Sequence, residues 1–201
     1  MIYLNEGDFT IMVISVILLV LAIILVVAFY GMYTGLIKKK NKLNEAMSGI
    51  DVQLNKRYSL IPNILTIANK FMEHETELFG QISALRSQAA GIRSTQDTIA
   101  KKIDLDNQIA AKMGQLMVNV ENYPQLKSDQ TMANAMQTYN ELEEHIAAAR
   151  RFYNSAVNDI NNSIEIFPSS LVAGMLGLTV YPFFEASEEA KKEINASDYL
   201  K

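Results

Sequence analysis

Residues 47 to 92 carry an apolar side chain at almost every position reached by alternating steps of three and four residues. The positions are Met47, Ile50, Leu54, Arg57, Ile61, Ile64, Ala68, Phe71, Glu75, Leu78, Ile82, Leu85, Ala89 and Ile92. Twelve of the fourteen are apolar, which is typical of one buried face of an α-helix about six heptads long. We therefore predict that residues 43 to 90 form one long central helix of a bundle, kinked at Pro62 and ending at Gly91.

An uncharged segment precedes this helix and places a second constraint on the fold. No charged side chain occurs between residues 9 and 37, and the stretch from Ile11 to Tyr33 is almost wholly apolar. About 20 apolar residues cross a bilayer as a helix. We therefore predict a transmembrane helix at residues 9 to 37, after a short extracytoplasmic N-terminus at residues 1 to 8. A cleaved signal peptide needs a basic start and a small-residue cleavage site, whereas Glu6 and Asp8 stand here instead.

Basic residues directly after the apolar segment set its orientation. They are Lys38, Lys39, Lys40 and Lys42. Basic flanks remain on the cytoplasmic side, so we expect residues 38 to 186 in the cytoplasm. The lysines can also hold anionic lipid headgroups, or they serve only as a stop-transfer flank. Gly31 and Gly35 form a G-x-x-x-G spacing that lets transmembrane helices approach closely, although it also arises by chance.

Two further helices and a short apolar segment follow. A helix from about Asp104 to Pro124 carries the stripe Leu105, Ile109, Met113, Leu116, Val120 and Tyr123. A third helix is capped by Ser128 or Asp129 and ends at Pro168. Residues 169 to 184 are apolar but too short to span a bilayer, and a charged tail occupies residues 187 to 201. Candidates in this segment for contact with a partner or a membrane are Leu171, Val172, Met175, Leu176, Phe183 and Phe184.

The predicted fold class is all-α. An N-terminal transmembrane helix is followed by an antiparallel up-and-down helical bundle of three long helices plus a short C-terminal segment. Its helices differ in length, at about 48, 20 and 40 residues as read from their stripes. Part of an apolar stripe would then stay uncovered in one chain, and such a patch usually marks an interface. We therefore expect homo-oligomers in the plane of the membrane.

Four charged residues interrupt the apolar stripes. They are Arg57 and Glu75 in the long helix and Glu143 and Arg150 in the third. A lone buried charge is costly, whereas a buried pair can fix the register of packed helices. The alternative is that the long side chains reach the edge of the seam and leave their charges in water. If buried, Arg57 is expected to pair with Glu143, because the first and third helices of an up-down-up bundle run parallel.

The sequence offers little catalytic or metal-binding chemistry. It has no cysteine, which excludes disulfides and thiolate metal sites. His74 and His145 lack the spacings of zinc and di-iron sites, and no glycine-rich phosphate loop is present. We predict no catalytic residue, metal or cofactor; the alternative is a membrane-bound metal protein or enzyme that uses His74 and nearby acids. After residue 37 the chain has 18 basic and 20 acidic residues, which gives no electrostatic case for nucleic acid binding.

Short motifs across residues 43 to 186 resemble those of one protein family. The matching residues are Ile50 to Tyr58, Leu60 to Asn63, His74-Glu75, Tyr123-Pro124, Leu126-Lys127, Ile146, Ala149 to Asn154, Val157, Asn161, Phe167 to Ser169 and Phe183 to Glu185. These motifs occur in the same order as in the LemA family of bacterial membrane proteins, which the chain therefore resembles. Met47 stands where the family usually has a tryptophan. The resemblance implies an N-terminal anchor and a cytoplasmic helical bundle at the bacterial inner membrane. It implies no activity, and one branch of the family is associated with magnetosome membranes.

These features favour a non-enzymatic, membrane-anchored helical scaffold that binds a protein partner at the inner face of the membrane. The alternative is a membrane-remodelling or organising protein that uses residues 169 to 184 as a second lipid contact. The sequence does not name the protein partner.

The lysine flank predicts that the C-terminal tail is fully protected from protease added to spheroplasts, because the bundle lies in the cytoplasm. Immunodetection of the tail after digestion, with and without detergent, measures this protection. Loss of the tail in intact spheroplasts would reverse the predicted topology.

Overall fold

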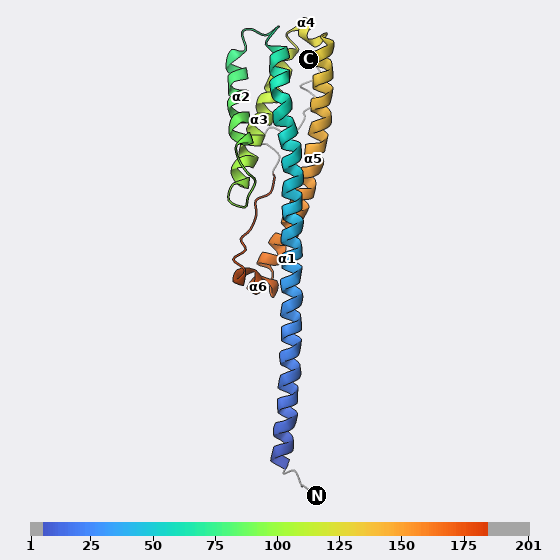
Figure 1. The fold of residues 1–201 in the computed structure, drawn as a ribbon, viewed down its shortest axis with the longest axis vertical. Helices are drawn as coiled ribbons and strands as arrows, with labels where there is room; N and C mark the ends of the chain where they lie inside the picture. Colours follow the sequence, from blue (N-terminus) through green and yellow to red (C-terminus); the bar gives the residue numbers. More distant parts are fainter. Residues whose placement is uncertain (1–5, 185–201) are drawn as a thin grey trace, which may run out of the picture. The chain divides into compact units, whose positions relative to one another are not determined.

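The computed structural model describes residues 6–184, and every regular element in that part of the chain is a helix (Figure 1). The helices are α1 (Glu6–Ala68), α2 (Thr76–Ala90), α3 (Ile99–Val120), α4 (Pro124–Lys127), α5 (Gln130–Glu165) and α6 (Ser169–Met175). This confirms the predicted all-α class. The predicted tail at residues 187–201 lies outside the described residues. The chain divides into two compact units. Among the described residues, the first takes in residues 6–42 with Asn158–Val180, and the second takes in Leu43–Val157 with residues 181–184.

The second unit is an up-and-down bundle whose long elements are α1, α2, α3 and α5 (Figure 1). The prediction of one helix over residues 43–90 is wrong, because α1 ends at Ala68 and α2 begins at Thr76. In the turn between them, the amides of Phe71 and Met72 both donate to the Ala68 carbonyl at 3.0 Å. Met72 is fully buried, as are stripe residues of both helices. The three-four spacing therefore continues through a reversal of the chain and does not reveal it.

Pro62 does not end α1, which continues unbroken to Ala68. Because proline has no amide hydrogen, it leaves the Tyr58 carbonyl without its helical donor. Arg86 of α2 supplies the missing bond, since its Nε donates to the Tyr58 carbonyl at 2.6 Å. Helix α2 thus provides the hydrogen bond that Pro62 removes from α1, and this contact joins the two helices.

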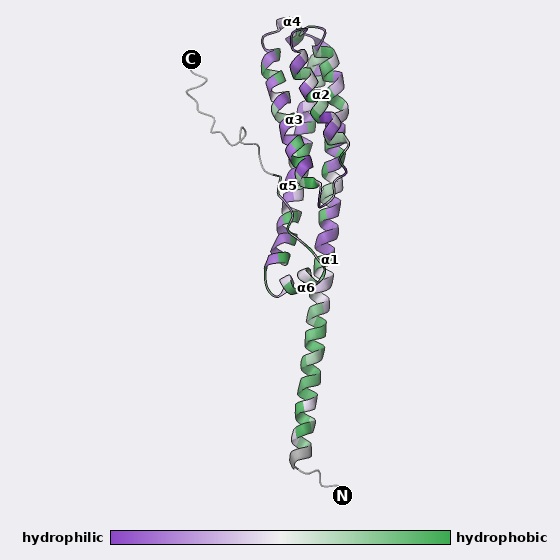
Figure 2. Cartoon of the chain, turned by 90° about the vertical axis from the view of Figure 1, so that its left-hand side faces the viewer, coloured by the Kyte–Doolittle hydropathy of each residue, from purple (hydrophilic) through white to green (hydrophobic). Residues whose placement is uncertain are grey.

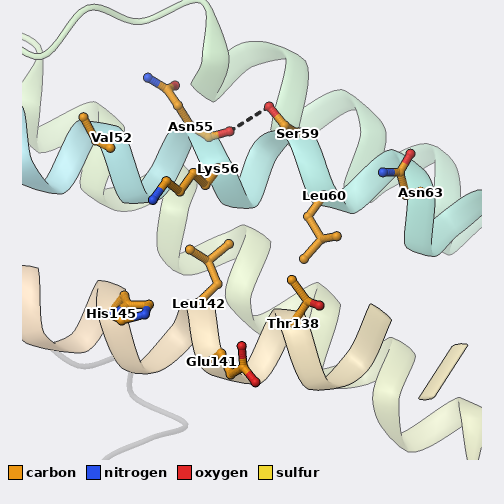
Figure 3. A pocket seen from close by; sticks show the side chains of 10 residues that line it. All are labelled: Val52, Asn55, Lys56, Ser59, Leu60, Asn63, Thr138, Glu141, Leu142 and His145. Carbon is orange, nitrogen blue, oxygen red and sulfur yellow. Dashed lines mark hydrogen bonds between the residues drawn. The ribbon is translucent and has the colours of Figure 1, made fainter. Parts of the chain in front are cut away.

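The remaining bundle helices begin close to the predicted positions. α3 starts at Ile99, ahead of the predicted Asp104. Asp129 caps α5, because its Oδ1 accepts the Met132 amide at 2.9 Å. Within the second unit, residue numbers rise along α1 and fall along α5 in the same direction, so the two helices are antiparallel (Figure 3). The predicted parallel arrangement is wrong, since the reversal at residues 69–75 makes α5 the fourth long element of the bundle instead of the third.

In the first unit, α6 packs on one face of α1. Val172 and Ala173 of α6 are buried against Leu36 of α1. Partly buried apolar side chains surround this contact, namely Met32, Ile164, Leu176 and Leu178. The unit therefore has its own small apolar core.

The N-terminal part of α1 contains the one stretch in the described chain that is long and apolar enough to cross a membrane. Figure 2 shows it as an uninterrupted hydrophobic stretch of the helix. Its side chains from Phe9 to Tyr33 are almost all exposed. By length and composition, this segment meets the requirement for a membrane span.

We expect Arg86→Met to destabilise the protein by about 1.5–3 kcal/mol, the usual worth of a hydrogen bond to a charged group, because the Tyr58 carbonyl loses its donor. In a Pro62→Ala background the same change should cost less, since residue 62 then offers an amide to that carbonyl. Urea unfolding of the four variants measures the free energies.

The control for this comparison is Arg151→Met, which removes an exposed arginine of α5 and should change stability little. Equal costs of Arg86→Met in the two backgrounds would contradict the assigned role of Arg86.

Candidate functional site: an ion cluster and a groove between α1 and α5

Charged side chains from three helices meet in the core of the second unit. Arg57 of α1 and Asp106 of α3 are both fully buried. Arg57 Nη2 contacts the Asp106 carboxylate and donates to the Asp106 carbonyl at 3.3 Å, while Nη1 donates to Glu143 Oε1 of α5 at 2.8 Å. Arg150, about two turns further along α5, donates to Asp106 Oδ2. We call Arg57, Asp106, Glu143 and Arg150 the ion cluster.

The ion cluster fixes the register of α1, α3 and α5. Each of its acids is engaged by a guanidinium group, and such charge-assisted bonds are the strong ones. Moving an ion from water into a protein core costs several kcal/mol, which only a well-placed partner offsets. A slip of any of the three helices would leave a buried charge unpaired, so alternative alignments are strongly disfavoured.

Two tyrosines beside the cluster are held in the neutral form. Burial raises the pKa of Tyr58 to about 12, against the lowering effect of Arg57. Burial also raises the pKa of Tyr139, again opposed by Arg57. For Arg150, burial lowers the guanidinium pKa and the positive charge of Arg57 acts in the same direction. At neutral pH the tyrosines therefore add hydroxyl groups and no charge to this layer of the core.

Phe184, the last described residue, covers Arg150. The guanidinium carbon of Arg150 lies 5.3 Å from the centre of the Phe184 ring, close enough for cation–π attraction. Tyr153 meets the same ring edge-on at 5.4 Å, and its hydroxyl donates to the Pro182 carbonyl at 3.0 Å. Asn154 donates to the Phe184 carbonyl at 2.9 Å and accepts its amide at 2.8 Å. Phe184 is thus buried within its own chain, which corrects its prediction as a partner or membrane contact.

One predicted acid, Glu75, lies away from the ion cluster, and one acid of the cluster, Asp106, was not predicted. Glu75 lies apart from the ion cluster, just before α2, where its Oε2 accepts Asn119 Nδ2 at 3.0 Å. Asp106, which both arginines share, is not among the predicted residues, although it lies inside the predicted helix, three residues before the stripe residue Ile109 and on the same face. With the observed start at Ile99, the buried stripe of α3 runs through Lys102, Asp106, Ile109 and Met113. An earlier helix start would have added Lys102 to this face, whereas Asp106 already lay within the predicted helix.

A second buried ion pair joins α3 to α1. Lys102 is almost fully buried, and its Nζ donates to Asp51 Oδ1 at 2.7 Å and to the Ile92 carbonyl at 3.2 Å. Ser94 also donates to Asp51. The connection between α2 and α3 is thereby attached to α1 through the same carboxylate.

An open groove of about 720 Å³ lies between α1 and α5 (Figure 3). It is lined by Val52, Asn55, Lys56, Ser59, Leu60, Asn63, Thr138, Glu141, Leu142 and His145. Residues at such three-four steps share one face of each helix. Leu60 and Leu142 point into the space between the helices (Figure 3), and Val52 is 52 % exposed at one end. The groove therefore combines accessible apolar surface with a polar rim that includes Lys56, Glu141 and His145.

The other predicted contact residues divide between buried and exposed positions. Val172 of α6 is buried and Leu176, the residue after α6, is half-buried, and both belong to the core formed with α1. Leu171 and Met175 are exposed on the same helix, and Phe183 is exposed in the second unit.

The predicted headgroup lysines lie at the end of the apolar segment. Lys42 Nζ pairs with Asp159 at 2.8 Å and Lys39 Nζ donates to Ser163, so two of the four are held by α5. Lys38 is exposed and Lys40 is half-buried.

Within residues 6–184, no group of three or more His, Cys, Asp or Glu side chains is placed to hold a metal ion. His74 is exposed in the turn before α2. His145 lies on α5 among the groove residues, near Glu141 (Figure 3).

Comparison with known proteins places the chain in a family. The model of the LemA family matches residues 46–197, which is most of the chain and all of the described bundle from Ala46 on. The chain belongs to the LemA family. This LemA-family protein is 25 % identical to Protein LemA of Metamycoplasma hominis over 174 residues, covering 85 % of its own length and 78 % of the relative. It is also 25 % identical over 196 residues to magnetosome proteins MamQ 1 and MamQ 2 of Paramagnetospirillum magneticum, covering 84 % of its own length and 71 % of theirs.

Asp106→Leu is expected to destabilise the bundle by about 3–5 kcal/mol, because it leaves two guanidinium groups without their shared acid. Adding Arg57→Met should recover part of that loss, since one of the orphaned charges disappears. Urea unfolding of both single variants and the double variant measures the coupling.

Lys127→Met is the matched control for the ion cluster. Lys127 pairs with Glu121, and both side chains are more than half exposed. Exposed pairs contribute about 0–1 kcal/mol, so this change should have a small effect. Purely additive costs for Asp106→Leu and Arg57→Met would refute the coupling.

Proposed function

We propose that this LemA-family protein is a membrane-anchored, non-enzymatic helical scaffold that binds another protein chain in the cytoplasm, at the inner membrane of a bacterium. The groove between α1 and α5 carries the proposal. It is open, it combines apolar surface with a polar rim, and one of its walls is the helix that also contains the span-length apolar segment. Amphipathic helices dock by laying their apolar face into grooves of this kind.

The rim of the groove defines the chemistry of its occupant. Lys56 on α1 and Glu141 on α5 place opposite charges on the two walls, with Leu60 and Leu142 between them. A complementary helix has one apolar stripe, with an acidic residue on the side that meets Lys56 and a basic residue on the side that meets Glu141. A polar helix without that stripe gains little from the groove, because it has no apolar surface to bury there.

The anchor supports both the orientation and self-association. The lysines that follow the span favour a cytoplasmic bundle. Apart from the neighbouring residues and the nearby backbone of α1 itself, nothing lies within 4 Å of the position that a Cβ of Gly31 or Gly35 would take, so this face of α1 is open to a second span. The expected uncovered stripe no longer supports homo-oligomers, because α2 folds back instead of extending α1. The glycine face is the feature that now supports them.

A second candidate function is the organisation of the membrane itself. Two relatives are named magnetosome proteins. The exposed apolar side chains of α6, Leu171 and Met175, favour a further lipid contact of the kind that such a role would use.

The scaffold proposal predicts a protein neighbour in the groove. A photo-reactive amino acid at Val52, activated in intact cells, should yield a crosslinked product, because this exposed side chain lies at the groove. The same amino acid at Val118, an exposed position on α3 that does not line the groove, is the control. Gel mobility and mass spectrometry identify the products.

Each outcome has a distinct meaning. A specific heterologous product from position 52 supports a partner-binding scaffold, and a product of twice the chain's mass shows that a second copy fills the groove. Indistinguishable products from positions 52 and 118 would contradict partner binding in the groove.

A further inference from the structure

The chain between Glu165 and Glu185 contains no charged residue. In the first unit, the exposed surface of this stretch is formed largely by bulky apolar side chains. Phe167 and Met175 are each 75 % exposed, Leu171 is 62 % exposed and Ile166 is 59 % exposed. Water-exposed apolar groups gathered on one short segment usually mark a contact surface.

The neighbouring helices place this surface at the end of the apolar segment of α1. Lys42 pairs with Asp159 and Lys39 with Ser163. Residue numbers therefore fall along α1 in the direction in which they rise along α5. One further turn brings Ile166 and Phe167 level with Leu36.

Helix α6 lies at the same level. Its buried residues Val172 and Ala173 pack on Leu36, and Met32 borders that contact. Figure 2 shows the hydrophobic stretch of α1 beginning beside α6. The exposed side of α6 therefore lies where α1 passes from polar to apolar surroundings.

We propose that Ile166, Phe167, Leu171 and Met175 insert into the interfacial layer of the bilayer that α1 crosses, giving the protein a second contact with lipid. The proposal rests on the membrane anchor in the proposed function. Short segments with bulky apolar side chains enter the boundary between headgroups and acyl chains in this way.

Lipid fits this surface better than a protein partner does. The exposed lysine Lys38 lies at the same end of the span and suits an anionic headgroup. The surface itself carries no charge that would align a protein partner. A span that places Lys38 among the headgroups also places Leu36, and with it α6, at the bilayer boundary.

The chain has no tryptophan, so one introduced residue reports its own surroundings without background from another tryptophan. Full-length Phe167→Trp and Met175→Trp variants are reconstituted into vesicles of phosphatidylcholine and phosphatidylglycerol. A matched set of vesicles contains lipids brominated on the acyl chain, which quench tryptophan on contact. We expect blue-shifted emission and loss of most of its intensity in brominated vesicles for both variants.

Two further single-tryptophan variants complete the test. Val26→Trp reports the span itself, since Val26 is exposed in the middle of the apolar segment. Asn158→Trp reports an exposed position on α5, about 10 Å along the helix axis from its end at Glu165 at 1.5 Å per residue. Emission from position 158 should stay red-shifted and unquenched.

The outcomes separate the inference from the proposed anchor. Quenching at positions 26, 167 and 175 but not at 158 supports the second lipid contact. Quenching at position 26 with none at 167 and 175 overturns it and leaves the anchor intact. No quenching at position 26 overturns the anchor, and equal quenching at 158 shows non-specific adsorption in place of the proposed insertion.

Discussion

The bundle depends on pairing the buried charge of Arg57 with acidic side chains from other helices. Arg57 is completely buried, and its guanidinium is compensated only when α3 brings Asp106 and α5 brings Glu143. Asp106 in turn needs both Arg57 and Arg150 around it. Apolar packing tolerates small shifts of one helix against another, whereas paired charges in a core do not. The ion cluster therefore supplies alignment, and the apolar stripes supply most of the driving force for folding.

The stripes themselves allowed much of the fold to be read from the sequence. The all-α class, the apolar span-length segment, the end of α2 at Gly91 and the Asp129 cap all follow from spacing and local chemistry. The reversal at residues 69–75 does not, because both arms of a helical hairpin bury their apolar faces in the same core. No glycine or proline marks that turn, and the one proline nearby, Pro62, lies inside a helix.

The candidate site was only partly accessible in the same way. The charge pattern brought Arg57 and Glu143 into view, because both interrupt an apolar stripe. Asp106 stayed hidden, since the predicted stripe ran from Ile109 back to Leu105 and left out its neighbour on the same buried face. The groove could not have been read from either helix alone, because its two walls meet only through the tertiary fold. Glu75 shows the opposite error. It was predicted as a buried stripe position, but it lies in the connection before α2 and contacts Asn119.

The order of the ion cluster along the chain has a consequence for synthesis. Arg57 is made 49 residues before Asp106, and Glu143, Arg150 and Phe184 follow later still. At about 5–20 residues per second, the ribosome needs a few seconds to supply the first partner and several more for the others. Until then the guanidinium has no acid to enter the core with, so α1 keeps this face in water while the rest of the bundle is made. The charge that fixes the finished register thus also delays closure of the core until α5 has been made.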